Sequence, residues 1–490
     1  MDSEFDAIVI GGGPAGSAAA TALALDGRRV VLLERTPFPR YHVGESLLPA
    51  TVHGICKTLG VAEAIRDAGF VRKRGGTFKW GSNPEPWTFA FGDQLAMPDA
   101  DFAYQVERAR FDEILLRNAE SRGTDVREGW TVERVLEAER IEGVVARDPG
   151  GAVHEIRARY VIDASGGSGL LSNVVGTRRY DAFFRNLALF GYFEGGRRLD
   201  PPNEGNILTV AFDEGWFWYI PLSDGRTSVG AVVRKEHAHR LKKADKRALL
   251  RELIERCPMV SEMLTDATDT TEAPYDEVRL LRDFSYTNDR FYDRGGVLVG
   301  DAACFIDPVF SSGVHLATLA GLMAARSINS CLAGEVSEED AFAEFTARYR
   351  REYGVFYQFL IGFYEIHRDP DSYFWDARKI VKAASSDREA FVRLVSGLAA
   401  AEPRFQTVDA FLDSTVDESR VLEAASQIES EWSTRDPALA ERARDHVNVL
   451  NRERRELLAE NVAPVLEGGL VASADGLRWR RQSGEEALAS

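Results

Sequence analysis

A glycine-rich segment near the N-terminus has the residue types and spacing of a loop that binds a pyrophosphate. Residues 11–16 read GGGPAG, which fits the pattern GxGxxG. In that pattern the glycines allow a tight turn, close approach of the backbone to phosphates, and close packing of a helix on a strand. The residues predicted to contact a dinucleotide here are Gly11, Gly13, Ala15 and Gly16.

The segments around these glycines are those that the pattern requires. An apolar run at residues 6–10 predicts a strand before them, and the Ala-rich run at residues 17–25 predicts a helix after them. A second apolar run, residues 29–33, ends at Glu34, which stands where an acidic residue binds a ribose hydroxyl. Strand, turn, helix and acidic residue together predict the βαβ unit of a dinucleotide-binding fold.

A second stretch able to do chemistry covers residues 296–319, GVLVGDAACFIDPVFSSGVHLATL. An apolar, strand-like run ends in Gly300 and Asp301, and a turn-rich stretch then leads through Ser312 and Gly313 into helical periodicity. A helix N-terminus presents unpaired backbone N–H groups and partial positive charge. Ser312 and Gly313 are therefore candidates to hold a small anion or a developing negative charge.

The centre of the chain has the periodicity of an antiparallel sheet. Between residues 187 and 233, short alternating runs are separated by Gly, Asp and Pro. One of these runs reads WFWYIP, and alternation places Trp216, Trp218 and Ile220 on one face of its strand. We interpret the sheet as a substrate-binding insertion.

At 490 residues the chain is long enough for two or three domains or for one large interleaved domain. The predicted fold class is α/β: a Rossmann-like dinucleotide-binding core spans residues 1–336, with the antiparallel substrate sheet inserted at about 187–285. Aromatic residues recur at helical intervals after Ser337, so residues 337–490 are predicted to form a helical C-terminal region.

Composition argues against several classes of function. Charged residues make up 28% of the chain, and no apolar run approaches the roughly 20 residues that span a bilayer. The net charge of -17 argues against nucleic acid as a partner, because a phosphate backbone would be repelled. The four cysteines are far apart and predict neither a disulfide framework nor a metal site. Because the N-terminus lacks a signal-type leader, we predict a cytoplasmic protein without a membrane partner.

Two further motifs favour FAD over NAD as the dinucleotide. The segment RARFD, followed by an apolar helix, resembles the RxxFDxxL element of the aromatic-hydroxylase flavoproteins, and the Gly-Asp pair of the second stretch resembles their GD motif. By that resemblance Arg108 and Asp301 contact the cofactor. Arg40 and Ser46, which flank a short polar loop, complete the predicted cofactor-binding set.

Five motifs, found in one order, give the chain a resemblance to the flavin-dependent halogenases: GGGPAG, GESLLP, KRGGTF, WFWYIP and GDAACFIDPVFSSG. The resemblance covers about residues 5–400 and is closest to the branch that chlorinates phenolic groups in nonribosomal peptide and polyketide pathways. In that family, FAD reduced by a separate reductase reacts with oxygen to give a C4a-hydroperoxide, which chloride attacks to form hypochlorous acid. The resemblance therefore implies FAD as cofactor, chloride as cosubstrate, a flavin reductase as transient partner, and a carrier protein that bears the substrate.

The resemblance also assigns roles to individual residues. By itself Lys73 would be one more exposed lysine, but the lysine that it matches hydrogen-bonds hypochlorous acid or forms a chloramine. An arginine, which stays protonated, would not suit chloramine formation. Trp216 and Trp218 match a pair that keeps the substrate away from the flavin. Ser312 and Gly313 match halide-binding amides.

Two departures from related families narrow the prediction. Tryptophan halogenases have a glutamate two residues before the Thr or Ser of the halide turn, where this chain has Phe310. A phenol needs less activation by the protein, because loss of its proton makes the ring electron-rich. Any nearby base could remove that proton, Glu45 among them. We therefore predict a phenolic substrate, with pyrrole second. The DG motif of related hydroxylases reads DASG from Asp163 onward, which fits reduction of the flavin by a partner.

Two other functions stay open at this point. An FAD hydroxylase would share the nucleotide motifs but would not require Lys73 or the pair Trp216 and Trp218. A catalytically silent flavin-binding scaffold subunit would keep the fold, and replacing Lys73 would then leave product formation unchanged. For residues 401–490, where the resemblance thins, we predict that the chain closes over the substrate entrance or receives a carrier protein.

Overall fold

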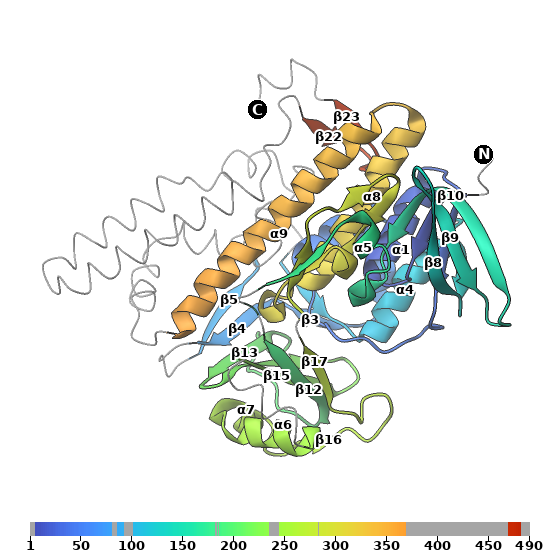
Figure 1. Cartoon of the computed structure of the whole chain (residues 1–490). Helices are drawn as coiled ribbons and strands as arrows, with labels where there is room; N and C mark the ends of the chain where they lie inside the picture. The colour runs from blue at the N-terminus through green and yellow to red at the C-terminus, as the bar shows by residue number, and fades with distance from the viewer. Residues whose placement is uncertain are drawn as a thin grey trace, which may run out of the picture.

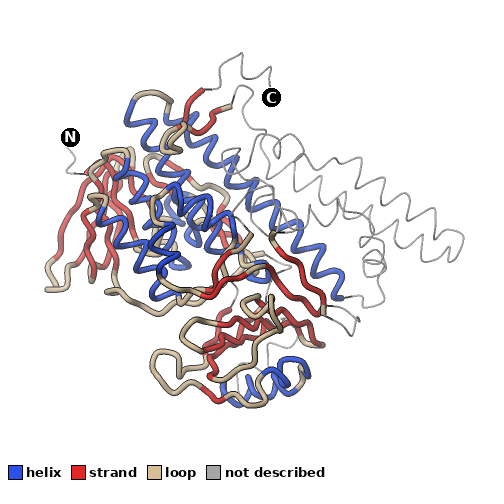
Figure 2. Tube along the Cα trace, turned by 180° about the vertical axis from the view of Figure 1, so that it is seen from behind, coloured by secondary structure: helices blue, strands red, loops and turns tan. Residues whose placement is uncertain are grey.

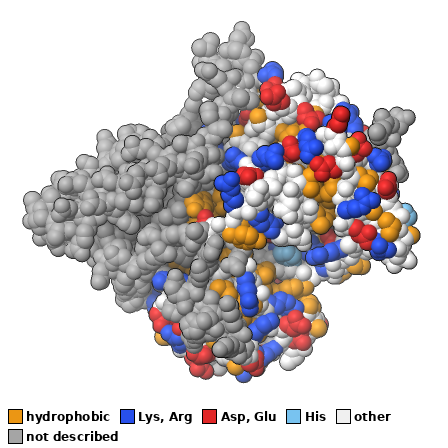
Figure 3. Space-filling model, in the orientation of Figure 1, with side chains coloured by type: hydrophobic (Ala, Val, Ile, Leu, Met, Phe, Trp, Pro, Cys, Tyr) orange, Lys and Arg blue, Asp and Glu red, His pale blue; other side chains and the backbone are white. Residues whose placement is uncertain are grey.

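Two large sheets and two long helices dominate the computed structural model (Figure 1). It describes residues 5–80, 86–92, 101–181, 184, 186–234, 245–282, 284–368 and 469–481. The role predicted for residues 401–490 therefore falls almost wholly outside the described residues. Lys and Arg side chains alternate with Asp and Glu over the described part of the face shown in Figure 3.

The first sheet contains the predicted nucleotide-binding unit. β1 (Phe5–Ile10), α1 (Pro14–Leu25) and β2 (Val30–Glu34) follow one another as predicted, and β1 pairs in parallel with β2 and with β10 (Val153–Asp163). The strand order is β19-β20-β10-β1-β2-β7, and β9 pairs antiparallel with β10 on one side and with β8 on the other. The remaining strands are β7 (Asp125–Glu128), β8 (Thr131–Glu137), β9 (Ile141–Arg147), β19 (Tyr292–Asp293) and β20 (Gly296–Leu298).

The second sheet contains the predicted alternating runs, two strands that lie earlier in the chain and two short strands that lie later. Its order is β16-β12-β15-β14-β13-β4-β5, and β17 also pairs with β12. The predicted alternation in WFWYIP is confirmed: Trp216, Trp218 and Ile220 pack toward the first sheet's core, whereas Phe217 and Tyr219 belong to a separate cluster. The strands are β4 (Gly75–Lys79), β5 (Trp87–Ala90), β12 (Leu187–Glu194), β13 (Ile207–Phe212), β14 (Gly215–Pro221), β15 (Arg226–Val233), β16 (Thr268–Asp269) and β17 (Arg279–Arg282).

Two short helices cover the outer face of the second sheet, α6 (Lys246–Glu255) and α7 (Pro258–Met263) (Figure 2). Leucines of α6 and Val260 of α7 join Phe217 and Tyr219 in the separate cluster. The opposite face of the sheet is therefore left to meet the nucleotide-binding core.

Close packing of α8 (Ser312–Ala333) on α1 depends on small side chains. A Cβ atom at Gly321 would lie 2.2 Å from the carbonyl oxygen of Ala15, so the backbones could not approach as closely with any other residue there. By length and composition α8 could cross a membrane, but 83% of its most apolar window is buried inside the protein. It serves here as a core helix.

Shorter elements connect these layers and carry several candidate residues. They are the π-helix η1 (Ala50–Ile55), α2 (Cys56–Thr58), α3 (Ala62–Asp67), β3 (Val71–Lys73), β6 (Ala103–Gln105), α4 (Arg108–Ser121), η2 (Gly166–Ser168), α5 (Ser172–Val175), β11 (Arg178–Tyr180), β18 (Tyr286–Asn288), η5 (Gly300–Ala302), β21 (Cys304–Phe305) and η6 (Pro308–Phe310). Strand β3 pairs with β6, and β18 lies between β11 and β21.

The long helix α9 (Glu338–Arg368) crosses the molecule from the C-terminal hairpin toward β4 and β5 (Figure 1). That hairpin consists of β22 (Leu470–Ala472) and β23 (Trp479–Arg481), in a region for which helical periodicity predicted helices alone. Trp479 is fully buried, and its Nε1 donates to Ser327 Oγ of α8 at 2.8 Å. The hairpin is therefore part of the core that supports α8.

Replacing Trp479 by alanine is expected to lower the free energy of unfolding by about 3–5 kcal/mol, because the change leaves a cavity in that core. Urea denaturation of the full chain, followed by circular dichroism, measures the change. Arg480→Ala is the control, because its exposed side chain predicts a change within about 0.5 kcal/mol. Small and equal changes in both variants would show that the hairpin does not stabilise the fold.

Candidate functional site

Lys73 is buried, not exposed as its basic neighbours alone would suggest. It ends β3, opposite Ala103 of β6, and only 3% of the residue is exposed. Its Nζ donates to the carbonyl oxygen of Leu47 at 3.0 Å and lies 5.6 Å from the ring centroid of Phe91. Burial lowers the pKa of the Lys73 amine to about 7, so a substantial fraction is uncharged near neutral pH.

A continuous series of aromatic rings joins Lys73 to the start of α8. Ring centroids lie 5.6 Å apart for Phe91 and Phe89, 6.0 Å for Phe89 and Phe78, and 6.3 Å for Phe78 and Phe310. Phe310 is itself buried and comes directly before the turn into α8. These apolar rings exclude water from the region between the amine and the helix start.

Trp216 and Trp218 form a second aromatic group on the inner face of the sheet. Their ring centroids lie 6.1 Å apart, and Trp80 lies 6.4 Å from Trp216. Trp218 Nε1 donates to Ser228 Oγ at 3.1 Å. The Trp218 ring also covers Gly230, where a Cβ atom would lie 2.2 Å from it. The hydrogen bond to Ser228 fixes the orientation of the Trp218 indole, and Gly230, which has no side chain, leaves room for the ring.

The start of α8 has the properties of an anion site. Ser311, at the N-cap, has a φ of 60° and makes no capping bond with its side chain. Ser312 is fully buried, and its Oγ has no hydrogen-bond partner among the described residues. A Cβ atom at Gly313 would lie 3.1 Å from the Phe305 ring. The uncapped first-turn N–H groups and the unpaired hydroxyl together favour a small anion.

The glycine segment forms a cradle that depends on missing Cβ atoms. Gly11 has a φ of +100°, and a Cβ atom there would lie 2.5 Å from the carbonyl oxygen of Ala164. A Cβ atom at Gly16 would lie 1.9 Å from the Gly11 oxygen. Glu34 Oε2 accepts from the backbone nitrogen of Gly12 at 2.8 Å and keeps a second lone pair for a ribose hydroxyl. These features fit the pyrophosphate and ribose of a dinucleotide.

Asp112 orients both predicted arginines of this cradle. Arg108 donates to its two carboxylate oxygens at 2.7 and 2.9 Å, and to the carbonyl oxygen of Val43 at 2.7 Å. Arg40 Nη1 lies 3.4 Å from Asp112 Oδ2, while its Nη2 lies 3.3 Å from where a Gly13 Cβ would be. Asp112 was not among the predicted site residues, although it follows Arg108 at the helical spacing i, i+4.

Asp301 and Ser46 carry polar groups that are available to a ligand. The Asp301 carboxylate makes no hydrogen bond to the described residues, and burial raises its pKa to about 6 against the opposing effects of Arg108 and Arg178. Ser46 Oγ is buried and has no hydrogen-bond partner in the part of the chain that the structure describes. A buried hydroxyl without a partner is costly, and the half-buried Asp301 carboxylate is open to a ligand, so both positions fit contacts with FAD.

Glu45 is engaged within the protein. Its Oε1 accepts from the hydroxyl of Tyr192 at 2.6 Å, and its Oε2 accepts from the backbone nitrogen of Gly44 at 3.0 Å. The Tyr192 hydroxyl also lies 2.9 Å from that of Tyr41. Burial raises the pKa of Glu45, which is the direction expected of a proton acceptor near neutral pH.

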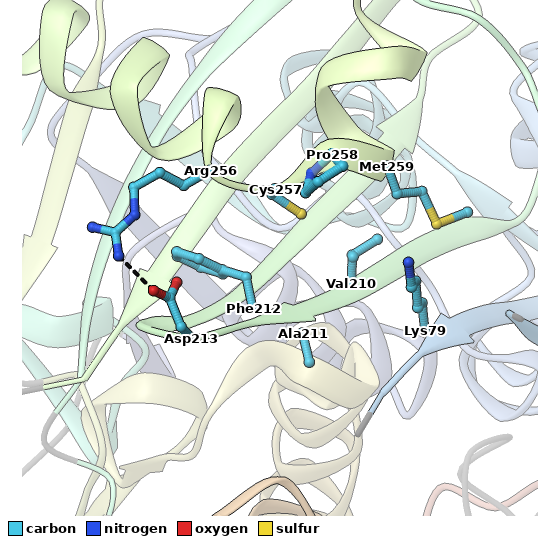
Figure 4. A pocket seen from close by; sticks show the side chains of 9 residues that line it. All are labelled: Lys79, Val210, Ala211, Phe212, Asp213, Arg256, Cys257, Pro258 and Met259. Atoms are coloured by element: carbon cyan, nitrogen blue, oxygen red, sulfur yellow. Dashed lines mark hydrogen bonds and ion pairs between the residues drawn. The ribbon is translucent and has the colours of Figure 1, made fainter. Parts of the chain in front are cut away.

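The cavity in Figure 4 lies on the other face of the second sheet. Val210 and Phe212 line it and belong to the cluster that packs on α6 and α7, and Arg256 pairs with Asp213 at its rim. Its volume is about 360 Å³, and its other lining residues are Lys79, Ala211, Cys257, Pro258 and Met259. It is therefore separate from Trp216 and Trp218, whose rings point the opposite way.

The described residues contain no group of three or more His, Cys, Asp or Glu side chains that could hold a metal ion. The structure instead contains a dinucleotide cradle, an uncapped helix start, a buried amine, and a series of aromatic rings that joins the amine to the helix start. The first two can hold FAD and a small anion.

Comparison with known proteins points to one family. The family model described as Tryptophan halogenase matches residues 6–100 and 94–417. The solved structure of the myxobacterial chondrochloren halogenase CndH, an FAD-dependent halogenase, superposes with a TM-score of 0.76. It is 49% identical, and the match covers 97% of this chain and 99% of that one.

Two curated proteins extend this similarity. A "Tryptophan 2-halogenase" of Chondromyces crocatus is 34% identical over 411 residues, which cover 81% of this chain and 76% of that protein. The "Flavin-dependent halogenase armH3" of Armillaria mellea is 32% identical over 457 residues, which cover 88% and 87%.

Proposed function

Because this chain belongs to the tryptophan halogenase family of flavin-dependent halogenases, we propose that it chlorinates a phenolic ring. Enzymes of this family use FAD, which a separate reductase supplies in reduced form, and chloride. When bound and reduced, FAD supplies hypochlorous acid from oxygen and chloride. Membership of this family favours halogenation over the hydroxylase and the silent scaffold that the motifs had left open.

We assign FAD to the cradle and chloride to the start of α8. The unpaired Ser312 hydroxyl and the first-turn N–H groups of Ser312 and Gly313 support the chloride assignment. The residues that would hold FAD are Gly11, Gly13, Ala15, Gly16, Glu34, Arg40, Ser46, Arg108 and Asp301.

The buried amine of Lys73 is the observation that carries the proposal. An uncharged amine has a lone pair that can take chlorine from hypochlorous acid, forming an N–Cl bond and releasing water. Removing the ammonium charge at the pH of the reaction normally requires burial, which Lys73 has. Trp216 and Trp218 would block direct contact between the substrate and the cofactor, leaving only a small oxidant to connect them.

The aromatic rings between Lys73 and α8, Phe310 among them, support a phenol as the substrate. Phe310 places a ring where tryptophan halogenases have a carboxylate, so the substrate must supply its own electron density. A phenol does so when it loses its proton, for which Glu45 is a candidate acceptor. Since a relative is named for tryptophan, an indole is the competing substrate. We further propose that a carrier protein bears this phenol. We also propose that the reaction takes place in the cytoplasm.

Product mass tests this proposal. The full-length protein, a flavin reductase, FAD, oxygen and chloride are incubated with a carrier-bound tyrosyl group, the same phenol free in solution, tryptophan, or a pyrrole. We expect the chlorine isotope pattern on a phenol. Chlorination of tryptophan alone, or hydroxylation without chlorine, would contradict the phenol assignment. Chlorination of the free phenol alone would remove the carrier protein from the proposal.

The rate of chlorine transfer is expected to rise with pH through about 7. The pKa of Lys73 is lowered to about 7, so the uncharged amine that forms the N–Cl bond becomes dominant above that pH. Single-turnover product formation measured from about two pH units below the pKa to about two units above it gives the profile. Lys73→Arg, which stays charged, should show low activity without this rise. A rate that falls through the same range would instead indicate that the ammonium acts as a hydrogen-bond donor.

A further inference from the structure

Three buried polar side chains meet beside the first turn of α8. His315, in that turn, places Nε2 3.0 Å from Glu352 Oε1 of α9 and Nδ1 3.4 Å from Thr51 Oγ1 of η1. The exposed fraction is 2% for His315, 3% for Glu352 and 0% for Thr51. None of the three belongs to the cofactor, halide or lysine sets described above.

The chemistry of the carboxylate sets the direction of one of these hydrogen bonds. An ionised Glu352 only accepts, so His315 donates to it from Nε2, whereas the Thr51 hydroxyl can either donate to Nδ1 or accept from it. Leaving any of these buried groups unpaired would cost free energy. Unlike an apolar contact, the chain of bonds is directional, so a shift of α8 against η1 or α9 would leave buried polar groups unpaired.

Two members of this chain, His315 and Thr51, lie next to the two parts of the proposed site. His315 shares the first helical turn with Gly313, whose N–H is assigned to chloride. Thr51 donates from its backbone nitrogen to Leu48 at 3.1 Å, and the neighbouring Leu47 carbonyl accepts from Lys73. One imidazole thus connects the start of α8 with the segment that holds the lysine amine.

We propose that the hydrogen-bonded chain of Thr51, His315 and Glu352 is a positioning device that holds the chloride-binding turn at a fixed distance from Lys73. The inference rests on the proposed roles of that turn and that lysine. Breaking the chain frees the first turn of α8 to shift, while the cradle residues for FAD lie on other elements. Chloride binding should weaken, and hypochlorous acid should escape more often before it reaches Lys73.

Glu352→Ala and Glu352→Gln, made in the full-length FAD-loaded protein, test this role. Glutamine keeps an oxygen that accepts from His315 Nε2, whereas alanine removes it. Chloride is titrated into the oxidised FAD complex and followed by flavin absorbance. We expect Glu352→Ala to weaken chloride binding about tenfold and Glu352→Gln to stay within about twofold, with FAD affinity unchanged in both. During turnover, dissolved methionine should trap a larger share of hypochlorous acid from Glu352→Ala.

Glu344→Ala is the matched control. Glu344 is a fully buried carboxylate on the same helix, but it bonds to Arg348 on the side of the C-terminal hairpin. The Glu344→Ala variant should bind chloride as tightly as the parent protein, even if the substitution lowers the free energy of unfolding. Equal chloride affinity in all variants, or equal losses in Glu344→Ala and Glu352→Ala, would overturn the positioning role. Because the titration needs no aromatic substrate, failure of the parent protein to chlorinate a phenol would count against the proposed function alone.

Discussion

Replacing Lys73 by alanine is expected to abolish chlorination, by about 1000-fold or more, while FAD stays bound and oxygen is still consumed. The amine is buried among Leu47 and Phe91, and no acidic side chain of the described residues neutralises it. Its removal leaves hypochlorous acid without the group that would direct it to the ring. Product formation, oxygen uptake and FAD absorbance, measured on one preparation, separate these steps.

Lys79→Ala provides the matched control for Lys73. Lys79 ends the next strand, β4, but lines the outer cavity of Figure 4. Its replacement should leave chlorination within about twofold of the parent. Loss of FAD together with activity in Lys73→Ala would identify a structural lysine. Unchanged product formation would agree with the silent-scaffold function and contradict the proposal.

Gly16→Ala is expected to weaken FAD binding by about 100-fold or more. The added Cβ would lie 1.9 Å from the Gly11 carbonyl oxygen, and a turn with a φ of +100° cannot yield without moving the whole cradle. FAD titration of the apoprotein, followed by flavin fluorescence, measures the loss. Circular dichroism of the same sample shows whether the fold survives.

Gly354→Ala controls for the general effect of adding a methyl group. Gly354 lies in α9, and a Cβ there would meet no atom within 4 Å. Alanine in a helix should stabilise the protein by about 0.5–1 kcal/mol and leave FAD affinity unchanged. Normal FAD binding by Gly16→Ala would show that the cradle tolerates the strain, and the cofactor assignment would need another basis.

Local rules were sufficient for the nucleotide-binding unit and for the face of WFWYIP. The glycine spacing, the flanking apolar runs and Glu34 follow from the geometry of one βαβ turn, and all lie within about 30 residues of one another. Alternation likewise places Trp216 and Trp218 together, because neighbouring side chains of a strand point to opposite faces. Neither inference needs a partner that is distant in the chain.

Long-range packing decided what the sequence pattern left open. The hairpin with Trp479 pairs with helices about 150 residues away along the chain, so helical periodicity before it predicted nothing of it. The contact of Asp112 with Arg40 joins residues 72 apart in the chain. The bonds of His315 to Glu352 and Thr51 likewise join residues that only the fold brings together.

The halide-binding turn and Lys73 show most clearly which features the sequence predicts and which depend on the tertiary structure. The residue types alone predicted an anion at Ser312 and Gly313, since any helix start presents unpaired N–H groups. Residue types alone predict that Lys73 is an ordinary exposed lysine, and only the family resemblance assigns it a catalytic role. Its burial and its lowered pKa arise from β6, the Leu47 carbonyl and Phe91, which only the folded chain brings around the amine. A charge state depends on everything that surrounds the group, so it is decided by the tertiary structure.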